Sequence, residues 1–521
     1  MTLQPLDEPI RSRRNHWVNQ IATHAIMRPD RVAFRCKGVD TTWQQLHERS
    51  EQFADALARR GVGFGDRVLI LALNYTEYIE AVMGINAVGA IAVPVNFRLT
   101  PPEVAYIVSD SGAKAVVTDN LLQPLAVGVA AQAPDLSTIV VINGQTADGV
   151  IGYDDFLAEP GEPHAPLDIP EDTPCLIMYT SGTTGAPKGA VLSHANMSAQ
   201  ALTCIRAMDL GADAIGFCTS PLFHIAGLGS LTPYFMLGGK TVLHPLGAFD
   251  ATEWLDAVEA EQASAAFCVP VQWQLICEEP TVKQRKLALQ ALCWGAAPAS
   301  DTVLRAMADC FPGAFNVAVF GQTEMSPITC VLDGKDALRK IGSVGKPIPT
   351  IQTRIVDDEM NDVAPGEIGE IVYRGPTLMS EYWNKPEATA EAFHGGWFHS
   401  GDLVRQDEEG FVYVVDRKKD MIISGGENIY CAEVENVLFA HPKIHEAAVV
   451  GRPHEKWGEV PVAVVALVEG ADDLTLEELE PFLNESLARY KHPKHLVIVP
   501  ELPRNASGKV VKVELRKQYS A

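Results

Sequence analysis

Short apolar runs alternate with amphipathic segments, and this alternation limits the fold more than any other feature of the sequence. A capping box at Thr42 and Gln45 begins a predicted amphipathic helix. Residues 68–73 and 90–95 then predict buried strands, with a helix at 77–88 between them. Strands that alternate with helices are typical of a sheet covered on both faces. The sequence therefore predicts an α/β fold.

The same texture continues to about residue 340 and then changes. Further strands are predicted at 175–179, 241–244, 265–269, 292–294 and 317–320. Short alternating runs follow and indicate a small β-rich subdomain, and a compact α+β region begins at Asp416. A chain of 521 residues exceeds the usual size of one domain. We expect a large, multi-subdomain N-terminal domain at 1–415 and a small α+β C-terminal domain at 416–521.

Composition excludes several classes of protein. The net charge of −24 argues against nucleic-acid binding, which needs a basic face. No apolar run approaches the ~18 residues of a membrane span. Residues 1–17 hold arginines but no apolar core of a secretion signal, and the ten cysteines form no CxxC pair. We expect a cytoplasmic protein with reduced thiols and no transmembrane segment, and a homodimer is an open alternative.

Residues 180–189, Thr-Ser-Gly-Thr-Thr-Gly-Ala-Pro-Lys-Gly, follow a predicted buried strand. Glycines allow backbone N–H groups to turn toward phosphate oxygens, hydroxyls add donors or hold Mg²⁺, and Lys188 adds a positive charge. The loop is not a Walker A sequence, because Gly189 follows the lysine. It predicts a phosphate-binding site, with a flexible surface loop as the alternative.

This loop resembles the signature loop of the adenylate-forming superfamily, which comprises acyl-CoA synthetases, nonribosomal peptide adenylation domains and luciferases. Seven further segments match that superfamily in its order: Pro221–His224, Gly295–Pro298, Phe320–Glu324, Ser400–Asp402, Asp416–Asp420, Ser424–Asn428 and Pro503–Lys509. The resemblance implies that the chain adenylates a carboxylic acid with ATP and Mg²⁺ and then passes the acyl group to CoA. Its small-molecule substrates would be the acid, ATP and CoA.

The resemblance also assigns residues to the nucleotide and the metal. Lys188, Glu324 and Lys509 would be catalytic, with Glu324 and Thr180 as the metal ligands. The nucleotide-binding residues would be Thr180, Ser181, Gly182, Thr183, Thr184, Gly185, Lys188, Gly295, Ala296, Ala297, Gly321, Gln322, Thr323, Asp402, Arg417 and Lys509. Two of these assignments have a chemical basis, because Asp402 can accept hydrogen bonds from ribose hydroxyls and Arg417 offers a fork of donors.

The remaining assignments concern the acid, CoA and a domain movement. By resemblance, Lys509 stabilises charge at the α-phosphate in the first half-reaction, and the mobile C-terminal domain then rotates about a hinge at Lys419. The rotation would withdraw Lys509 and bring the 424–427 loop to the site for attack by the CoA thiol. The substrate-binding residues would be His224, Ile225, Leu228, Trp397, Ser424, Gly425 and Gly426.

The segment Phe223-His224 bears on the choice of acid. Amino-acid-activating relatives usually carry an aspartate there, which would bind an ammonium group, and this chain has His224 instead. Residues 225–231 are apolar and small and favour an apolar tail. A medium- or long-chain fatty acid is the leading expectation, within fatty acid metabolism. The alternatives are an aryl-CoA ligase and a fatty acyl-AMP ligase that delivers to a carrier protein.

Overall fold

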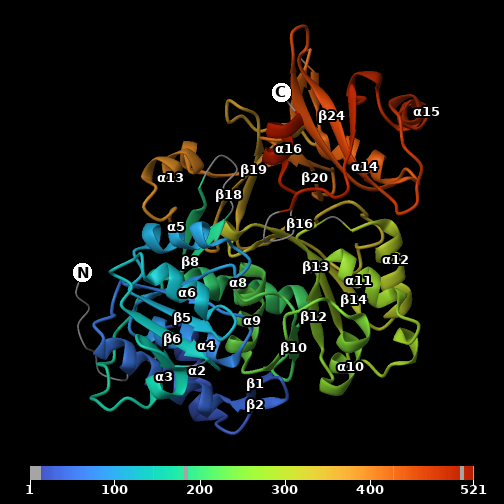
Figure 1. Cartoon of the computed structure of the whole chain (residues 1–521). Coiled ribbons are helices and arrows are strands. Elements are labelled where there is room, and N and C mark those ends of the chain that lie inside the picture. The colour runs from blue at the N-terminus through green and yellow to red at the C-terminus, as the bar shows by residue number, and fades with distance from the viewer. Residues whose placement is uncertain are drawn as a thin grey trace. The chain divides into compact units, whose positions relative to one another are not determined.

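The computed structural model describes residues 13–144, 146–180, 186–297, 299–425, 427–504 and 510–519. The chain forms two compact units. Unit 1 comprises residues 1–352 and 374–391, and unit 2 comprises residues 353–373 and 392–521 (Figure 1). The predicted boundary between residues 415 and 416 falls within unit 2. This boundary marks where a mobile domain would begin. The division into compact units does not test such a movement, so the boundary stays a prediction.

The first sheet of unit 1 has seven strands. Its order is β7 (Val150–Gly152), β6 (Thr138–Ile142), β5 (Ala115–Asp119), β3 (Arg67–Leu71), β4 (Ile91–Pro94), β8 (Pro174–Thr180) and β9 (Lys188–Ser193). All neighbours are parallel except β8 and β9, which form an antiparallel pair. The parallel strands are buried apolar runs, as the sequence predicts.

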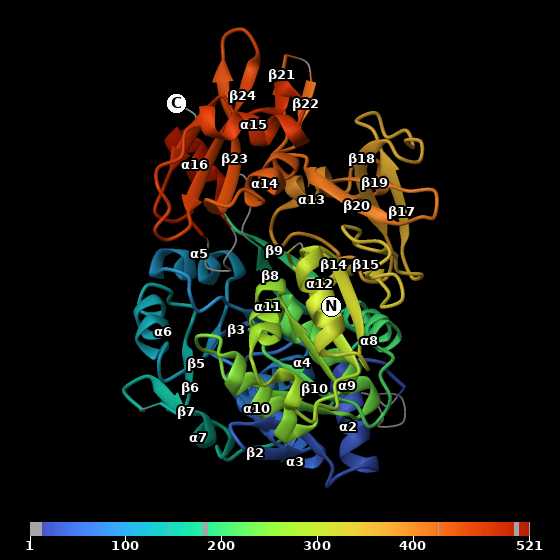
Figure 2. The same ribbon diagram turned by 90° about the vertical axis from the view of Figure 1, so that its right-hand side faces the viewer.

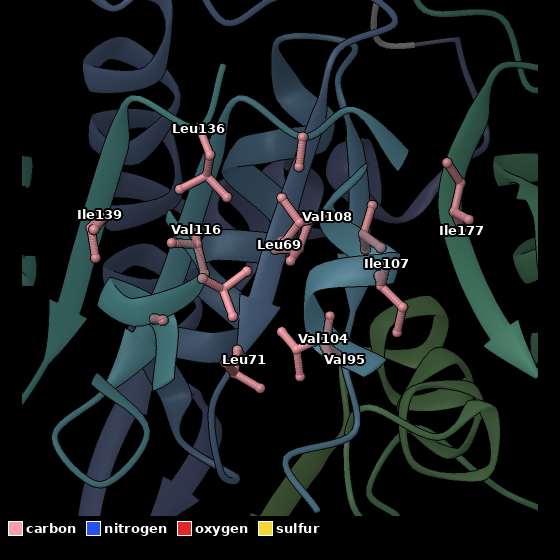
Figure 3. Packing of buried hydrophobic residues seen from close by; sticks show 14 of the residues in the cluster. Leu69, Leu71, Val95, Val104, Ile107, Val108, Val116, Leu136, Ile139 and Ile177 are labelled. Atoms are coloured by element: carbon pink, nitrogen blue, oxygen red, sulfur yellow. The ribbon is translucent and has the colours of Figure 1, made fainter. Parts of the chain in front are cut away.

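Helices α5 (Pro101–Ser111) and α6 (Gln123–Ala130) cover one face of this sheet (Figure 1). Figure 3 shows the cluster that they close, in which Val104 and Val108 of α5 face Leu69 and Val116 of the strands. A Thr100–Glu103 capping box starts α5. Burial of these aliphatic side chains provides the main stabilisation of the layer.

The second sheet of unit 1 has nine strands. Its order is β16 (Lys346–Pro347), β15 (Ile328–Leu332), β14 (Phe315–Gly321), β13 (Ala291–Gly295), β12 (Ala265–Cys268), β10 (Ile215–Cys218), β11 (Lys240–Leu243), β1 (Val32–Cys36) and β2 (Val39–Thr42). The strands from β14 to β1 run parallel. In a parallel sheet, side chains that follow the carboxyl ends of neighbouring strands gather at one edge.

The remaining helices of unit 1 lie before, between or after these strands along the chain. They are α2 (Trp17–Met27), α3 (Trp43–Arg59), α4 (Thr76–Ala87), α7 (Tyr153–Leu157), α8 (His194–Met208), α9 (Ile225–Leu237), α10 (Ala251–Glu261), α11 (Pro270–Glu278), α12 (Asp301–Cys310) and α13 (Pro386–Ala392), with 3-10 turns η1 (Val282–Gln284) and η2 (Thr323–Met325). The predicted capping box at the start of α3 is confirmed, because Thr42 and Gln45 bond reciprocally. The predicted α/β class is confirmed as well.

Unit 2 contains two sheets that are largely antiparallel. One is the sheet β17 (Gln352–Val356), β18 (Ile368–Arg374), β19 (Phe398–Gln406) and β20 (Val412–Arg417), with the turn η3 (His394–Gly396). The other has the order β22 (Glu427–Ile429), β21 (Ile422–Ser424), β24 (Gly458–Leu467) and β23 (Ile444–His454), and β25 (His495–Ile498) pairs with β24. The β-rich subdomain and the α+β region predicted from sequence are both present.

Helices α14 (Cys431–Phe439) and α15 (Leu476–Ser486) lie against β23 and β24 (Figure 2). A capping box of Thr475 and Glu478 starts α15, and Leu479 and Leu483 are buried. The turn η4 (Arg489–Lys491) and helix α16 (Lys512–Tyr519) complete the unit. No helix in the described part of the chain is long and apolar enough to cross a membrane.

Candidate active site

The two ends of the predicted phosphate loop are fixed by a strand pair. Thr180 ends β8, Lys188 begins β9, and the two residues are partners in the antiparallel register. The Thr180 hydroxyl also donates to the Lys188 carbonyl, at 3.4 Å. Five predicted nucleotide-binding residues between them, Ser181, Gly182, Thr183, Thr184 and Gly185, lie outside the described residues. The hairpin thus holds one hydroxyl and one ammonium group at the base of the loop.

Glu324 is a buried carboxylate with a defined partner. It lies in η2, directly after β14, and only 8% of its surface is exposed. The Tyr382 hydroxyl donates to its Oε1 at 2.9 Å. The Tyr382 ring also faces Lys188, whose Nζ is 5.1 Å from the ring centroid. The structure therefore links Lys188 and Glu324, two predicted catalytic residues, through one tyrosine.

The backbone around Glu324 is closely packed. A Cβ atom on Gly321 would lie 1.8 Å from the Pro327 carbonyl oxygen, so only glycine fits there. Gln322 donates its backbone N–H to the same carbonyl, at 2.9 Å. The buried Gln322 Nε2 has no hydrogen-bond partner among the described residues. With Thr323, these residues form a fixed turn that offers one unused donor.

The predicted adenine segment follows β13. A Cβ on Gly295 would lie 2.3 Å from the Val319 carbonyl oxygen, so glycine lets β13 approach β14. Ala296 has a left-handed φ of 65°, and Ala296 and Ala297 are exposed. Pro298, the last residue of the motif, lies outside the described residues. The segment presents small exposed side chains at the end of the parallel strands, and its role at adenine stays a prediction.

The predicted acid-binding residues lie at the start of α9. His224 is the N-cap, and its Nδ1 accepts the Ala226 N–H at 3.1 Å. Ile225 and Leu228 are at most 1% exposed and belong to the core. A Cβ on Gly227 would lie 2.2 Å from the Pro221 carbonyl oxygen. Gly227 therefore lets the backbone of Pro221 pack closely against α9. The absence of a side chain at Gly227 leaves no open space for a ligand.

In unit 2, the β19–β20 hairpin places Asp402 opposite Arg417. Arg417 Nε lies 2.7 Å from Asp402 Oδ1, and Asp402 is 4% exposed, whereas 42% of the arginine side chain is accessible. The Ser400 hydroxyl accepts the Asp402 N–H at 3.0 Å. Trp397, just before β19, has the Arg354 guanidinium 5.5 Å from its ring centroid. The structure thus brings together the predicted ribose and phosphate ligands.

The predicted hinge is connected to the C-terminal helix. Arg516 of α16 donates to the Lys419 carbonyl at 3.3 Å and pairs with Asp420 at 2.7 Å. Burial raises the pKa of nearby Asp416, which accepts the N–H groups of Arg417 and Cys431. These contacts define the conformation around Lys419, and its role as a hinge stays a prediction.

The predicted CoA loop follows β21. Ser424 ends this strand and pairs with Gly458 of β24. Gly425 has a left-handed φ of 62° and donates its N–H to the Trp457 carbonyl at 2.7 Å. Gly426 and Lys509 lie outside the described residues. The described part of the loop therefore rests against Trp457, and its role toward CoA stays a prediction.

Tyr382 is the residue that sequence reasoning missed. It lies 58 positions from Glu324, and no motif or spacing connects the two. The tyrosine stands in the segment Glu381-Tyr-Trp-Asn-Lys-Pro386, whose aromatic pair before a proline is the only local signal. Its importance follows from a contact between distant segments, which only the fold reveals.

The two sets of residues have complementary chemistry. Unit 1 offers an ammonium group, a buried carboxylate, a hydroxyl and an amide donor, which suit a polyphosphate and its metal ion. Unit 2 offers a carboxylate and a guanidinium in contact, which suit ribose hydroxyls and phosphate oxygens. The first set can bind and polarise phosphates, and the second can bind ribose hydroxyls or phosphate oxygens.

Comparisons with known proteins agree with this chemistry. The AMP-binding enzyme family model matches residues 21–383, and the AMP-binding enzyme C-terminal domain model matches residues 433–509. Feruloyl-CoA synthase of Amycolatopsis sp is 39% identical over 95% of this chain and 97% of its own length. Indoleacetate–CoA ligase of Aromatoleum aromaticum is 38% identical over 96% and 97%. Long-chain-fatty-acid–CoA ligase FadD13 of Mycobacterium tuberculosis is 35% identical over 93% and 94%.

A solved structure agrees over nearly the whole chain. The o-succinylbenzoate CoA synthetase of Bacillus subtilis, in complex with its acyl-adenylate intermediate, has a TM-score of 0.85 and 30% identity, and 99% of each chain is covered. The same enzyme in complex with ATP and magnesium ion has a TM-score of 0.84 at 30% identity, and the alignment covers 99% of this chain and 100% of the other. The chain therefore belongs to the AMP-binding enzyme family of the adenylate-forming superfamily, and it is an AMP-forming acid–CoA ligase.

Proposed function

We propose that the acid is aromatic, and that the chain is an aryl- or arylalkyl-CoA ligase. The observation that carries this proposal is the identity of 39% and 38%, over almost full length, to relatives named feruloyl-CoA synthase and indoleacetate–CoA ligase. Both names denote acids with a ring. This support moves the preference from a medium- or long-chain fatty acid to the aryl alternative.

The start of α9 gives physical support. The inference of a fatty acid depends on small residues that leave room for a long tail. Gly227 instead admits the Pro221 carbonyl, and Gly229 would carry a Cβ 3.3 Å from Pro327. Next to His224, the Phe223 ring meets Phe97 edge to face, with centroids 5.1 Å apart. Aromatic side chains favour offset or edge contacts with a ring, so this pair suits an aromatic acid.

A fatty acid is the second candidate. The 35% identity to the long-chain-fatty-acid–CoA ligase favours it, over 93% of the chain. Both candidate functions use the same groups to bind ATP. They differ only in the acid that the chain accepts. A direct comparison of acids therefore separates them.

The proposed mechanism has two steps. An oxygen of the acid attacks the α-phosphorus of ATP, and the bond to pyrophosphate breaks. The thiol of CoA then attacks the acyl carbon, and the carbon–oxygen bond to AMP breaks. Lys188 and Lys509 would oppose the negative charge that develops on the phosphates, while Asp402 and Arg417 would hold the ribose. Gln322 Nε2 would supply a further donor to the nucleotide.

The donor set suits a magnesium ion. Mg²⁺ binds hard oxygen ligands and usually takes only one or two carboxylates, with substrate phosphates and water as the others. Glu324 offers a buried carboxylate and Thr180 a hydroxyl, and no cluster of three or more His, Cys, Asp or Glu side chains occurs among the described residues. We assign Glu324 and Thr180 to this ion, which when bound would neutralise phosphate charge.

The test compares acids in the same assay. Ferulate, indoleacetate and benzoate are offered with ATP, Mg²⁺ and CoA, in parallel with octanoate and palmitate, and AMP, pyrophosphate and thioester are measured. We expect kcat/KM to be about fivefold or more higher for one of the aromatic acids, since one well-placed ring contact is worth roughly 1 kcal/mol beyond its burial. A higher kcat/KM for octanoate or palmitate would contradict the proposal and support the second candidate.

A further inference from the structure

Tyr382 contacts both charged groups of the unit 1 site. Its hydroxyl donates to Glu324 Oε1 at 2.9 Å, and Lys188 Nζ lies 5.1 Å from the centroid of its ring. Tyr382 is itself 9% exposed. One side chain therefore reaches an anion through its hydroxyl and a cation through its ring face.

The backbone of Tyr382 is fixed against β9. Ala190 and Tyr382 form an antiparallel bridge, and the Trp383 N–H donates to the Gly189 carbonyl at 2.7 Å. The Tyr382 N–H donates to the Thr389 hydroxyl at 3.0 Å. Because the same strand carries Lys188, the tyrosine and the lysine are held on adjacent, paired backbones.

The same segment is also fixed to Glu324. The Met379 N–H donates to the Glu324 carbonyl at 2.7 Å, three residues before Tyr382. Glu324 is therefore held once by its backbone and once by its carboxylate. A carboxylate fixed in this way keeps one orientation, because rotation about its last bond would break the tyrosine hydrogen bond.

We infer that Tyr382 is a positioning residue for the activation of ATP: its hydroxyl orients the Glu324 carboxylate toward the metal ion, and its ring holds Lys188 toward the phosphates. This inference rests on the proposed roles of Glu324 and Lys188. The outer partners of metal ligands set the ligand orientation, and the negative face of an aromatic ring attracts an ammonium group. Tyr382 would thus align two groups of opposite charge for one substrate.

The test measures ATP binding to the full chain by calorimetry, with Mg²⁺ and in EDTA. Tyr382→Phe removes the hydroxyl and keeps the ring. The ratio of ATP affinity with Mg²⁺ to ATP affinity in EDTA should be about tenfold smaller in this variant than in wild type. The reason is that losses of such outer partners cost about 10–100-fold in metal affinity. Binding in EDTA should stay within about twofold of wild type, because the ring that faces Lys188 remains.

A second variant tests the ring. Tyr382→Leu removes the hydroxyl and the aromatic face together. It should reproduce the loss of the Mg²⁺ effect and should also weaken ATP binding in EDTA, by about threefold, because Lys188 loses its ring partner. Binding in EDTA equal to that of Tyr382→Phe would overturn the role assigned to the ring.

Tyr153→Phe is the matched control. Tyr153 is also buried, and its hydroxyl donates to a main-chain oxygen of unit 1, that of Glu77, at 3.3 Å. Loss of the Tyr153 hydroxyl should leave ATP binding unchanged, both with Mg²⁺ and in EDTA. An equal weakening in this control and in Tyr382→Phe would show a general structural effect and would overturn the inference.

Glu324→Gln separates this inference from the proposed function. Loss of the Mg²⁺ effect in Glu324→Gln, with a full effect retained in Tyr382→Phe, would overturn only the role of Tyr382. A full effect retained in both variants would overturn the metal role proposed for Glu324 as well. We expect both variants to lose the effect.

Discussion

At the scale of single residues, the two carboxylates assigned to ribose and metal binding are held in the same way. Asp402 and Glu324 are both nearly buried, and each has a strong partner, Arg417 Nε at 2.7 Å and the Tyr382 hydroxyl at 2.9 Å. A buried carboxylate with a fixed partner loses little conformational entropy when a ligand arrives. Preorganisation of this kind suits a site that must bind a flexible nucleotide.

The ribose contact gives the first prediction at this scale. Asp402→Asn removes the negative charge that pairs with Arg417 and weakens an acceptor for ribose hydroxyls. We expect the KM for ATP to rise about tenfold or more, because hydrogen bonds to a charged group contribute roughly 1.5–3 kcal/mol. The KM for the acid should change little. Steady-state kinetics with each substrate varied in turn measures both values.

Asp407→Asn provides the control for this variant. Asp407 lies in the turn of the same hairpin, where it accepts the N–H groups of Glu409 and Phe411. Its replacement should affect stability and leave the KM for ATP unchanged. A similar rise in KM for both variants would assign the effect to distortion of the hairpin and contradict a ribose contact at Asp402.

At the scale of elements, local signals in the sequence were sufficient wherever neighbours along the chain determine the structure. The predicted strand at 175–179 corresponds to β8, and the predicted capping box begins α3. Contacts between distant segments were not predictable in this way. The small residues before Leu231 suggest open space, whereas Gly227 packs on the Pro221 carbonyl, and nothing near Glu324 in the sequence indicates Tyr382. Tertiary packing decides such cases.

The contact between α3 and α4 leads to a prediction on pH. Arg49 of α3 donates through Nε to both carboxylate oxygens of Glu80 on α4, at 2.8 and 2.9 Å. Glu80 is 2% exposed, and burial raises its pKa to about 7, although Arg49 opposes this shift. In the unfolded chain the same group titrates near its usual pKa of about 4.3.

The sign of the pH effect follows from these two values. Between about pH 4.3 and 7, the folded state binds a proton that the unfolded state has lost, so stability falls as the pH rises. The contribution is on the order of 4 kcal/mol across the window. We expect Glu80→Gln, whose amide does not titrate, to gain apparent melting temperature relative to wild type between pH 5 and 8.

Melting curves of both proteins across this range provide the measurement. Glu48→Gln is the control, since Glu48 is an exposed residue of α3 that bonds only to Gln44 among the contacts described for it. This variant should follow wild type at every pH. A constant difference in melting temperature between Glu80→Gln and wild type would contradict a raised pKa at Glu80.

At the scale of the whole molecule, the candidate residues for one reaction are distributed over both compact units. Thr180, Lys188 and Glu324 belong to unit 1, and Asp402 and Arg417 belong to unit 2. The two AMP-binding family models likewise match separate stretches of the chain. A reaction whose groups are divided in this way can use different groups for its two steps, if the units move between the steps.

Lys509→Ala tests this division of labour. The first step moves charge onto the phosphates around the α-phosphorus, where an ammonium group lowers the barrier, whereas the second step attacks an acyl carbon with AMP already in place. We therefore expect the variant to lose acid-dependent ATP–pyrophosphate exchange by about 10²-fold or more, as for removal of one preorganised electrostatic donor. Thioester formation from preformed acyl-AMP and CoA should stay within about threefold of wild type, because proximity and orientation at the acyl carbon remain.

Lys517→Ala is the control, since Lys517 is an exposed lysine of α16, and this variant should keep both steps. An equal loss of both steps in Lys509→Ala would mean that one lysine serves one arrangement throughout the reaction, and the proposed rotation about Lys419 would then have no chemical purpose.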